Sequence, residues 1–197
     1  MHRDEALLRA ALLRETGVSS DFDLNPGVTP AEGRILRPAA VLVAVGLWGD
    51  TAQVILTKRS SRLQHHPGQI AFAGGKVEVG ERLEDAALRE AWEEIGLPAS
   101  QVDIIGRLPV HETVTGFVVT PVLAVVRQAF EAVPERGEVD EVFTVPLRHV
   151  MDRARYVIER RNWMGGPRLY YAVPYGPYYI WGATARMLRG LADRMGP

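Results

Sequence analysis

A helix followed by residues that stop helices constrains the fold of this chain most strongly. Over residues 84–95 apolar side chains recur at helical spacing. Gly96 suits the position just beyond a helix, and Pro98 prevents the helix from continuing. We therefore expect a helix over residues 84–95. Its apolar side, turned away from its acidic side, is made of Leu88, Ala91, Trp92 and Ile95.

Three glutamates crowd the last turns of this helix. Glu94 lies about 40° from Glu90 around the helix axis and Glu93 lies about 60° to the other side, so all three project from one face. Each like-charged pair destabilises a helix by about 0.2–0.5 kcal/mol, and acidic groups near a C-terminus oppose the helix dipole. Such a face is commonly a solvated surface. Alternatively, the cluster is completed by a hard cation such as Mg²⁺, which prefers oxygen ligands.

Short apolar runs predict strands on both sides of the helix. Runs at 39–48 and 53–57 are separated by Gly49, Asp50 and Thr51, which favours a hairpin. The remaining expected elements are strands at 101–109, 117–126, 142–145 and 169–173, helices at 3–15 and 183–195, and a connecting loop over 18–37. This alternation predicts an α/β sheet covered by helices on both faces.

Composition limits the classes of function. With 197 residues, 47% of them hydrophobic, the chain can bury a substantial core, and its length fits one domain with extensions. A formal net charge of -1 creates no global field for nucleic acid or an anionic membrane, so we expect a small-molecule partner. The absence of cysteine excludes disulfides, thiolate metal sites and cysteine nucleophiles.

No sequence segment predicts a membrane location. The longest apolar stretch, at residues 38–48, is shorter than the roughly 20 residues that span a bilayer. The N-terminal sequence MHRDEALLRAALLRE does not resemble a signal peptide. We therefore expect a cytoplasmic protein.

Residues 75–97, GKVEVGERLEDAALREAWEEIGL, match a named motif. The fixed positions are Gly75, Glu81, Arg89, Glu90, Ala91, Glu93, Glu94, Gly96 and Leu97. This block resembles the Nudix box. The resemblance implies an α/β/α sandwich with a mixed sheet between helices, formed by a single domain over residues 1–197 with N-terminal and C-terminal helix extensions. It also implies hydrolysis of a nucleoside diphosphate linked to another moiety, with Mg²⁺ or Mn²⁺ as cofactor.

The resemblance to the Nudix box also implies a metal site. Glu90, Glu93 and Glu94 are the expected metal ligands, with the carbonyl oxygen of Gly74 as an additional one. Divalent ions at a pyrophosphate would neutralise its charge and acidify the attacking water.

Arg89 and Glu93 are included among the catalytic residues that the resemblance implies. Arg89 is expected to pair with a box carboxylate and, together with Glu81, to hold the loop against the helix. An ordinary surface ion pair is the alternative. Arg82 stands where the family often has a small hydroxyl residue that caps the helix, a change that costs about 1 kcal/mol of helix stability.

Hydrolysis also requires a general base. The segment EVDEVFTVPL, at residues 138–147, resembles the one that supplies this base in many Nudix proteins. Glu138 is the first candidate and Glu141 the second. The alternative is that both are ordinary solvated acids of a loop.

The basic run before the box is more specific than its composition. Lys58, Arg59 and Arg62 could hold substrate phosphates or form a soluble basic loop. The order LTKRSSRLQHHPGQIAFAGG, at residues 56–75, resembles the signature of the coenzyme A pyrophosphatase branch of the Nudix family. Ala73 stands where that branch usually has proline. The segment YIWGATARML, at residues 179–188, resembles the end of that branch.

This second resemblance implies cleavage of coenzyme A or a derivative into adenosine 3′,5′-bisphosphate and 4′-phosphopantetheine. Arg59 and Arg62 are the expected contacts of the extra phosphate, and Gln69 either contacts substrate or braces the loop. His65 and His66 fit loop packing or solvent exposure better than metal binding.

Several alternatives remain open. The substrate could be ADP-ribose, NADH or a dinucleoside polyphosphate, or the chain could be a catalytically silent nucleotide-binding module. A homodimer is compatible with the sequence. A tyrosine cluster could stack an adenine or pack the sheet; its members are Tyr170, Tyr171, Tyr175, Tyr178 and Tyr179.

Overall fold

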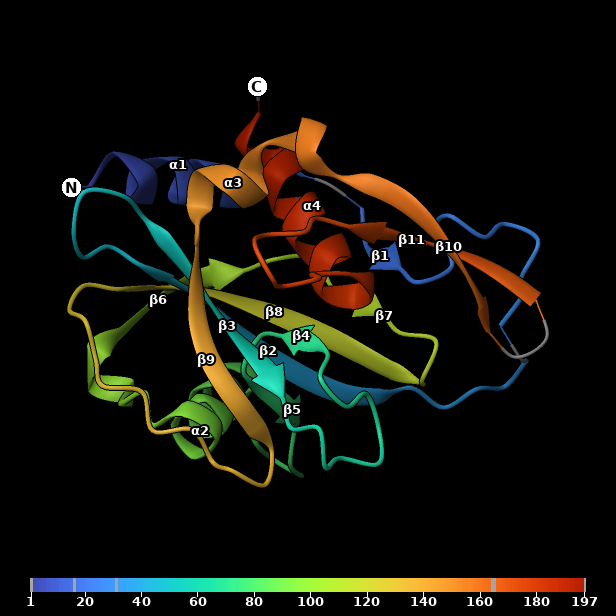
Figure 1. Ribbon diagram of the computed structural model, residues 1–197, viewed down its shortest axis with the longest axis horizontal. Coiled ribbons are helices and arrows are strands. Elements are labelled where there is room, and N and C mark those ends of the chain that lie inside the picture. The colour runs from blue at the N-terminus through green and yellow to red at the C-terminus, as the bar shows by residue number, and fades with distance from the viewer. Residues whose placement is uncertain (1, 16, 31, 164–165, 197) are drawn as a thin grey trace.

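The computed structural model describes residues 2–15, 17–30, 32–163 and 166–196, with only the backbone of Trp163. The described strands form a nine-stranded mixed sheet and a separate two-stranded hairpin (Figure 1). The large sheet contains β1 (Ser19–Ser20), β2 (Arg37–Gly46), β3 (Gln53–Arg59), β4 (Ile70–Ala71), β5 (Gly74–Lys76), β6 (Val102–Arg107), β7 (His111–Glu112), β8 (Phe117–Val126) and β9 (Val139–Pro146). The other elements are β10 (Val157–Trp163), β11 (Gly166–Ala172), α1 (Arg3–Leu12), α2 (Leu83–Ile95), α3 (Leu147–Met151) and α4 (Gly182–Met195).

A long parallel pair forms the centre of the sheet, whose main path runs β1-β7-β8-β2-β3-β4. β2 and β8 are paired from Arg37↔Phe117 to Gly46↔Val126. Most positions of both strands are buried, which explains their nearly continuous apolar sequences. β3 also pairs with β9 in antiparallel orientation. The basic end of β3 therefore lies beside the acidic start of β9.

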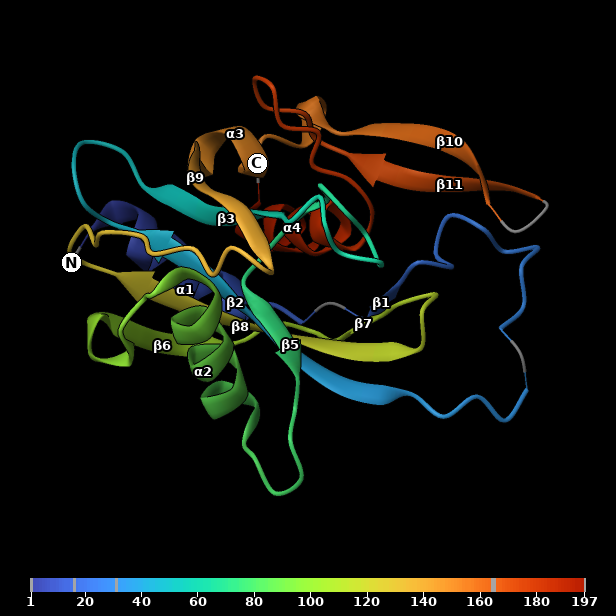
Figure 2. The ribbon, with the colours of Figure 1, turned by 60° about the horizontal axis from the view of Figure 1, so that its bottom comes forward.

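Helices cover both faces of the sheet (Figure 2). In that view α2 lies below the sheet, and α3 and α4 lie above it. Alanines let α2 approach closely, and the core on this side includes Ala40, Ala44, Ala86, Ala87 and Ala91. The core on the opposite face includes Leu8 of α1, Val150 of α3 and Leu188 of α4. The predicted α/β/α sandwich with a mixed sheet is thus confirmed.

The predicted elements agree best with the structure where the sequence pattern is long. β8 has the predicted bounds, and α2 and α4 each begin one residue before the predicted start. The expected hairpin exists, but β2 and β3 pair only at Val45↔Val54 and Gly46↔Gln53. Nearer the start of β2, residues 39–41 pair with β5 instead. α1 ends at Leu12 rather than Glu15, and the next side chain, Leu13, is exposed.

Some elements have no counterpart in the sequence pattern. β4, β5 and β7 are two or three residues long, too short to display a period of two. The predicted loop over 18–37 contains β1, and α3 and β10 were also not predicted. No helix in the described ranges is long and apolar enough to cross a membrane.

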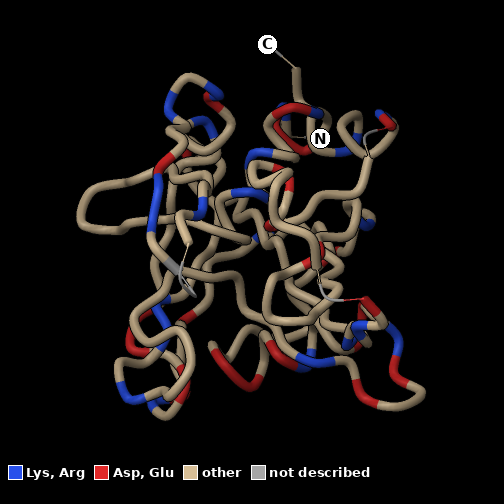
Figure 3. Tube along the Cα trace, turned by 90° about the vertical axis from the view of Figure 1, so that its right-hand side faces the viewer, with Lys and Arg blue, Asp and Glu red and all other residues tan. Residues whose placement is uncertain are grey.

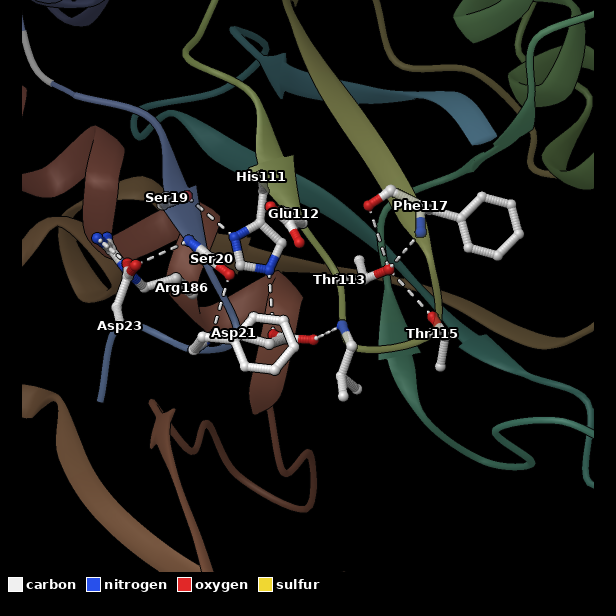
Figure 4. Close-up of polar contacts among 12 residues, drawn as sticks. Ser19, Ser20, Asp21, Asp23, His111, Glu112, Thr113, Thr115, Phe117 and Arg186 are labelled. Atoms are coloured by element: carbon white, nitrogen blue, oxygen red, sulfur yellow. Dashed lines mark hydrogen bonds and ion pairs between the residues drawn. The ribbon is translucent and has the colours of Figure 1, made fainter. Parts of the chain in front are cut away.

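A buried histidine fixes the N-terminal segment to the sheet (Figure 4). The side chain of His111 in β7 is fully buried. Its Nδ1 lies 2.9 Å from Ser19 Oγ, and its Nε2 lies 3.1 Å from Asp21 Oδ1. The N–H of Val114 donates to the other Asp21 oxygen at 2.9 Å. Because both ring nitrogens have partners, this buried group anchors β1 to β7.

Candidate active site

The Nudix-like block folds as a strand, a loop and a helix. β5 pairs with β2, and residues 77–82 lead into α2. A Cβ at Gly75 would lie only 2.5 Å from Glu90 Oε1, so this position requires glycine while the carboxylate stays there. Gly96 ends α2 in the left-handed conformation, with φ of 70°. Arg82 occupies the N-cap position and makes no side-chain capping hydrogen bond.

Arg89 connects the loop to the helix. Its Nε and Nη2 donate to the two carboxylate oxygens of Glu81 at 2.8 and 3.1 Å. Nη2 also donates to the carbonyl oxygen of Lys76 at 3.1 Å. Nη1 donates to Glu90 at 2.8 Å and to Glu93 at 3.1 Å. Hydrogen bonding to Glu81, followed by that to Glu90, raises the pKa of Arg89 above its ordinary value, although burial opposes this shift. Arg89 therefore contacts three carboxylates, which distinguishes it from an ordinary surface ion pair.

Glu94 is the most buried glutamate of the block, with 5% of the residue exposed. Its Oε2 accepts a hydrogen bond from the N–H of Gly74 at 3.3 Å. Burial, together with the charges of Glu90 and Glu138, raises the pKa of Glu94 to about 8, while the Gly74 N–H and the charge of Arg59 oppose this rise. The surroundings thus disfavour the charged carboxylate unless a cation is present.

Glu90 and Glu93 lie beside this carboxylate with different exposures. The Glu90 side chain is 16% exposed, whereas that of Glu93 is 55% exposed. Burial raises the pKa of Glu90, and the hydrogen bond from Arg89 opposes that rise. An oxygen-only donor set fits a hard divalent cation. Within the described ranges no three acidic or histidine side chains converge into a preformed metal-binding group, so water or substrate would have to complete the coordination shell.

Arg59, at the end of β3, lies within electrostatic range of these carboxylates, because its charge acts on the pKa of Glu94. Its Nε is buried and has no hydrogen-bond partner in the described part of the chain. A buried donor left unpaired costs about 1–3 kcal/mol. A bound anion that accepted a hydrogen bond from this Nε would remove that cost. Lys58 precedes Arg59 on β3, whereas Arg62 lies exposed in the following loop.

Gln69 braces the loop over residues 60–69. Its carbonyl oxygen accepts the N–H of Arg59 at 3.0 Å, and its own N–H donates to the carbonyl oxygen of His66 at 3.3 Å. His66 has a φ of 55°, which a side-chain-bearing residue rarely adopts. His65 and His66 are exposed, as their interpretation as loop residues predicts. The Gln69 backbone therefore holds the two ends of this loop together, and the role of the Gln69 side chain stays a prediction.

The start of α4 supports the same loop. Thr184 Oγ1 donates to the carbonyl oxygen of Ile70 at 3.0 Å in a buried position. A Cβ at Gly182 would lie 3.6 Å from Gln69 Nε2. Sequence reasoning missed these contacts, although the resemblance of residues 179–188 to the end of a known branch pointed to the segment.

The two candidate bases have different surroundings. Glu138 is exposed, and its charge contributes to the raised pKa values of Glu90 and Glu94. Glu141 Oε1 instead accepts the hydroxyl hydrogen bond of Tyr178 at 2.5 Å. Glu138 is therefore the carboxylate within electrostatic range of the box glutamates, whereas Glu141 already has a partner.

The tyrosines that could stack a nucleobase contact one another and the fold. Tyr178 stacks on Phe143 with ring centroids 3.6 Å apart. Tyr170 packs against Trp181 at 5.0 Å, and its hydroxyl lies 3.3 Å from that of Tyr179. These contacts favour the packing interpretation over the stacking of adenine.

Charges of both signs are interspersed along the chain (Figure 3), in line with the net charge of -1. The candidate site therefore depends on a local arrangement of cations and carboxylates.

Comparison with known proteins gives this arrangement a family. Residues 36–164 match the model of the NUDIX domain. The chain belongs to the Nudix family. One relative is NudL, an uncharacterized Nudix hydrolase from Enterobacter sp. (strain 638). It is 40% identical over 164 residues, which cover 81% of this chain and 83% of NudL. NudL of Klebsiella pneumoniae (strain 342) is 39% identical over the same shares.

Two solved structures share the Nudix fold. RenU, a Nudix hydrolase of M. smegmatis, is 27% identical with a TM-score of 0.51, covering 62% of this chain and 84% of that one. DR0079 from Deinococcus radiodurans is 15% identical with a TM-score of 0.52, covering 82% and 88%. Membership of the family makes this chain a Nudix hydrolase, an enzyme that acts on a nucleoside diphosphate derivative and uses a divalent metal ion.

Proposed function

We propose that this Nudix hydrolase cleaves the pyrophosphate bond of coenzyme A or a derivative, yielding adenosine 3′,5′-bisphosphate and 4′-phosphopantetheine. The branch signature at residues 56–75 supports this substrate. The surroundings of Arg59 carry the proposal. Its buried Nε has no hydrogen-bond partner among the described residues, and its charge lowers the pKa of Glu94. A cation beside the metal-ligand candidates suits a substrate rich in phosphate.

Glu90, Glu93 and Glu94, with the carbonyl oxygen of Gly74, would hold Mg²⁺ or Mn²⁺. The buried carboxylates with raised pKa values fit this role, as does the space that Gly75 leaves for the Glu90 carboxylate. A bound divalent ion would offset the phosphate charge and acidify the attacking water.

The remaining side chains would orient substrate and transfer the proton. Arg89 holds Glu81, Glu90 and Glu93 in one arrangement, which would fix the ligand geometry. Glu138 would accept the proton of the attacking water.

The proposal assigns phosphate contacts to Lys58, Arg59 and Arg62. Arg62 is exposed and would meet the 3′-phosphate, the group that distinguishes coenzyme A from its dephosphorylated form. Gln69 would hold the loop that carries Arg62 and remains a candidate for direct substrate contact.

We further propose one Nudix domain over residues 1–197, because Arg194 of α4 donates to the carbonyl oxygen of Ala11 in α1 at 3.1 Å. The proposed partner is a small molecule, without nucleic acid or membrane. The proposed location is the cytoplasm, and a homodimer is left open.

One experiment tests the substrate. The purified protein is incubated with Mg²⁺ or Mn²⁺ and, separately, with coenzyme A, dephospho-coenzyme A, ADP-ribose, NADH and a diadenosine polyphosphate, and the products are identified by mass spectrometry. We expect 4′-phosphopantetheine from coenzyme A, and expect Arg62→Ala to reduce the preference for coenzyme A over its dephosphorylated form. Turnover of ADP-ribose or NADH without turnover of coenzyme A would refute the assignment. No product from any substrate would favour a nucleotide-binding module.

A further inference from the structure

Asp140 is the extra residue of a β-bulge in β9. The ladder between β3 and β9 pairs Lys58 with Glu141 and then Arg59 with Val139, so Asp140 has no opposite residue on β3. A bulge of this kind bends the strand and changes the direction of a side chain. It occurs between the strand that ends in Arg59 and the strand that begins next to Glu138.

The bulged residue contacts the basic loop across this junction. Asp140 Oδ2 accepts the N–H of Ser61 at 2.9 Å. This hydrogen bond, the hydroxyls of Ser60 and Ser61 and the charge of Lys58 hold the pKa of Asp140 below its ordinary value. The carboxylate is therefore charged at neutral pH and holds the first turn of the loop that follows β3.

A second hydrogen bond connects the same two segments. The N–H of Ser60, a fully buried residue, donates to the carbonyl oxygen of Glu138 at 2.7 Å. The loop is thus fastened to β9 at two consecutive residues, Ser60 and Ser61. Because Arg59 and Arg62 flank these serines, a shift of this junction would move the candidate phosphate contacts relative to Glu138.

We propose that Asp140 is a positioning residue that fixes the end of β3 at Arg59 and the following loop, which bears Arg62, relative to the candidate base Glu138. This inference rests on the proposed function. Asp140 contacts neither substrate nor metal in this scheme, and it acts through the backbone of Ser61.

The test compares Asp140→Ala with Asp140→Asn. The amide oxygen of asparagine still accepts from the Ser61 N–H, whereas alanine cannot. A displacement of about 1 Å can cost up to roughly 100-fold in rate, so we expect Asp140→Ala to lower kcat/KM about 10-fold and Asp140→Asn to stay within about 2-fold of the wild type. Hydrogen exchange should show faster exchange at the Ser61 amide in Asp140→Ala than in Asp140→Asn.

Asp152→Ala is the matched control. Asp152 also accepts a backbone N–H, from Ala154 at 3.0 Å, in an exposed position of another segment. We expect its loss to leave kcat/KM unchanged. Melting temperatures within about 2 °C of the wild type would show that each variant folds.

The outcomes separate this proposal from the substrate assignment. A wild type that hydrolyses no coenzyme A refutes the substrate assignment, and the Ser61 exchange rates still test the contact. An active wild type with an equally active Asp140→Ala overturns the positioning role. Equal losses in the alanine and asparagine variants would indicate that the charge of Asp140 matters rather than its hydrogen bond, and would also overturn the proposal.

Discussion

Arg89 donates to both carboxylate oxygens of Glu81, at 2.8 and 3.1 Å, and so joins the loop of the Nudix box to its helix. The same guanidinium reaches Glu90 through Nη1 at 2.8 Å. A planar fork can serve both carboxylates at once, whereas an ammonium group cannot reproduce this geometry.

We therefore expect Arg89→Lys to lower kcat by about 10- to 100-fold, because the candidate metal ligand Glu90 loses its orientation. Steady-state kinetics at saturating metal measure the effect. Arg107→Lys is the control, since Arg107 forms a similar fork with Glu84 near the start of the same helix, at 2.6 and 2.8 Å. Equal kcat values for Arg89→Lys and Arg107→Lys would contradict a positioning role for Arg89.

Glu90→Gln should abolish turnover and leave the fold intact. The substitution removes a charge from a half-buried group whose charged form is already disfavoured, so the metal-free variant should fold at least as well as the wild type. Mg²⁺ should raise the melting temperature of the wild type more than that of the variant. Glu78→Gln, on the exposed part of the loop, is the control and should behave like the wild type. Equal metal-induced shifts in the wild type and Glu90→Gln would count against this metal site.

The metal-free enzyme should lose stability as pH rises from about 4.5 to 8. Burial raises the pKa of Glu94 from 4.5 to about 8, so in this interval the folded state binds more protons than the unfolded state. The free energy of unfolding must then fall with increasing pH, by on the order of several kcal/mol. Glu90, whose pKa is also raised, contributes with the same sign.

Urea denaturation of wild type and Glu94→Gln between pH 4.5 and 8, in the presence of a chelator, measures this dependence. The slope of unfolding free energy with pH should be much smaller in the variant, because glutamine does not titrate. Identical slopes for the two proteins would show that the Glu94 pKa is not raised by burial.

Glu138→Gln should slow turnover strongly, whereas Glu141→Gln should slow it less. Glu138 lies within electrostatic range of the box glutamates, while Glu141 accepts the hydroxyl of Tyr178 at 2.5 Å. A lost general base typically costs about 100- to 10,000-fold in rate. In the profile of kcat against pH, the fall at low pH that protonation of the general base causes should disappear only in Glu138→Gln. A larger loss in Glu141→Gln would exchange the two assignments.

The sequence by itself determined the elements whose patterns are long and local. The apolar period and the Gly96 and Pro98 stop signals predicted α2, and the alternation of strands and helices predicted the layered sheet. The nine fixed positions within residues 75–97 resembled the Nudix box, and the match of residues 36–164 to the NUDIX domain confirmed the family. The sequence also predicted a poorly capped helix, because arginine stands at position 82 instead of a small hydroxyl residue, and Arg82 makes no side-chain capping hydrogen bond.

Only the tertiary structure decided which distant segments meet. Three features depend on pairing and packing between residues far apart in the chain. They are the bulge that brings Asp140 to Ser61, the hydrogen bond from Tyr178 to Glu141 and the burial of Glu94. Short strands such as β4 and β7 exist because longer neighbours offer them an edge. Local sequence patterns carry no record of such contacts, since the free energy that selects them arises between segments and not within them.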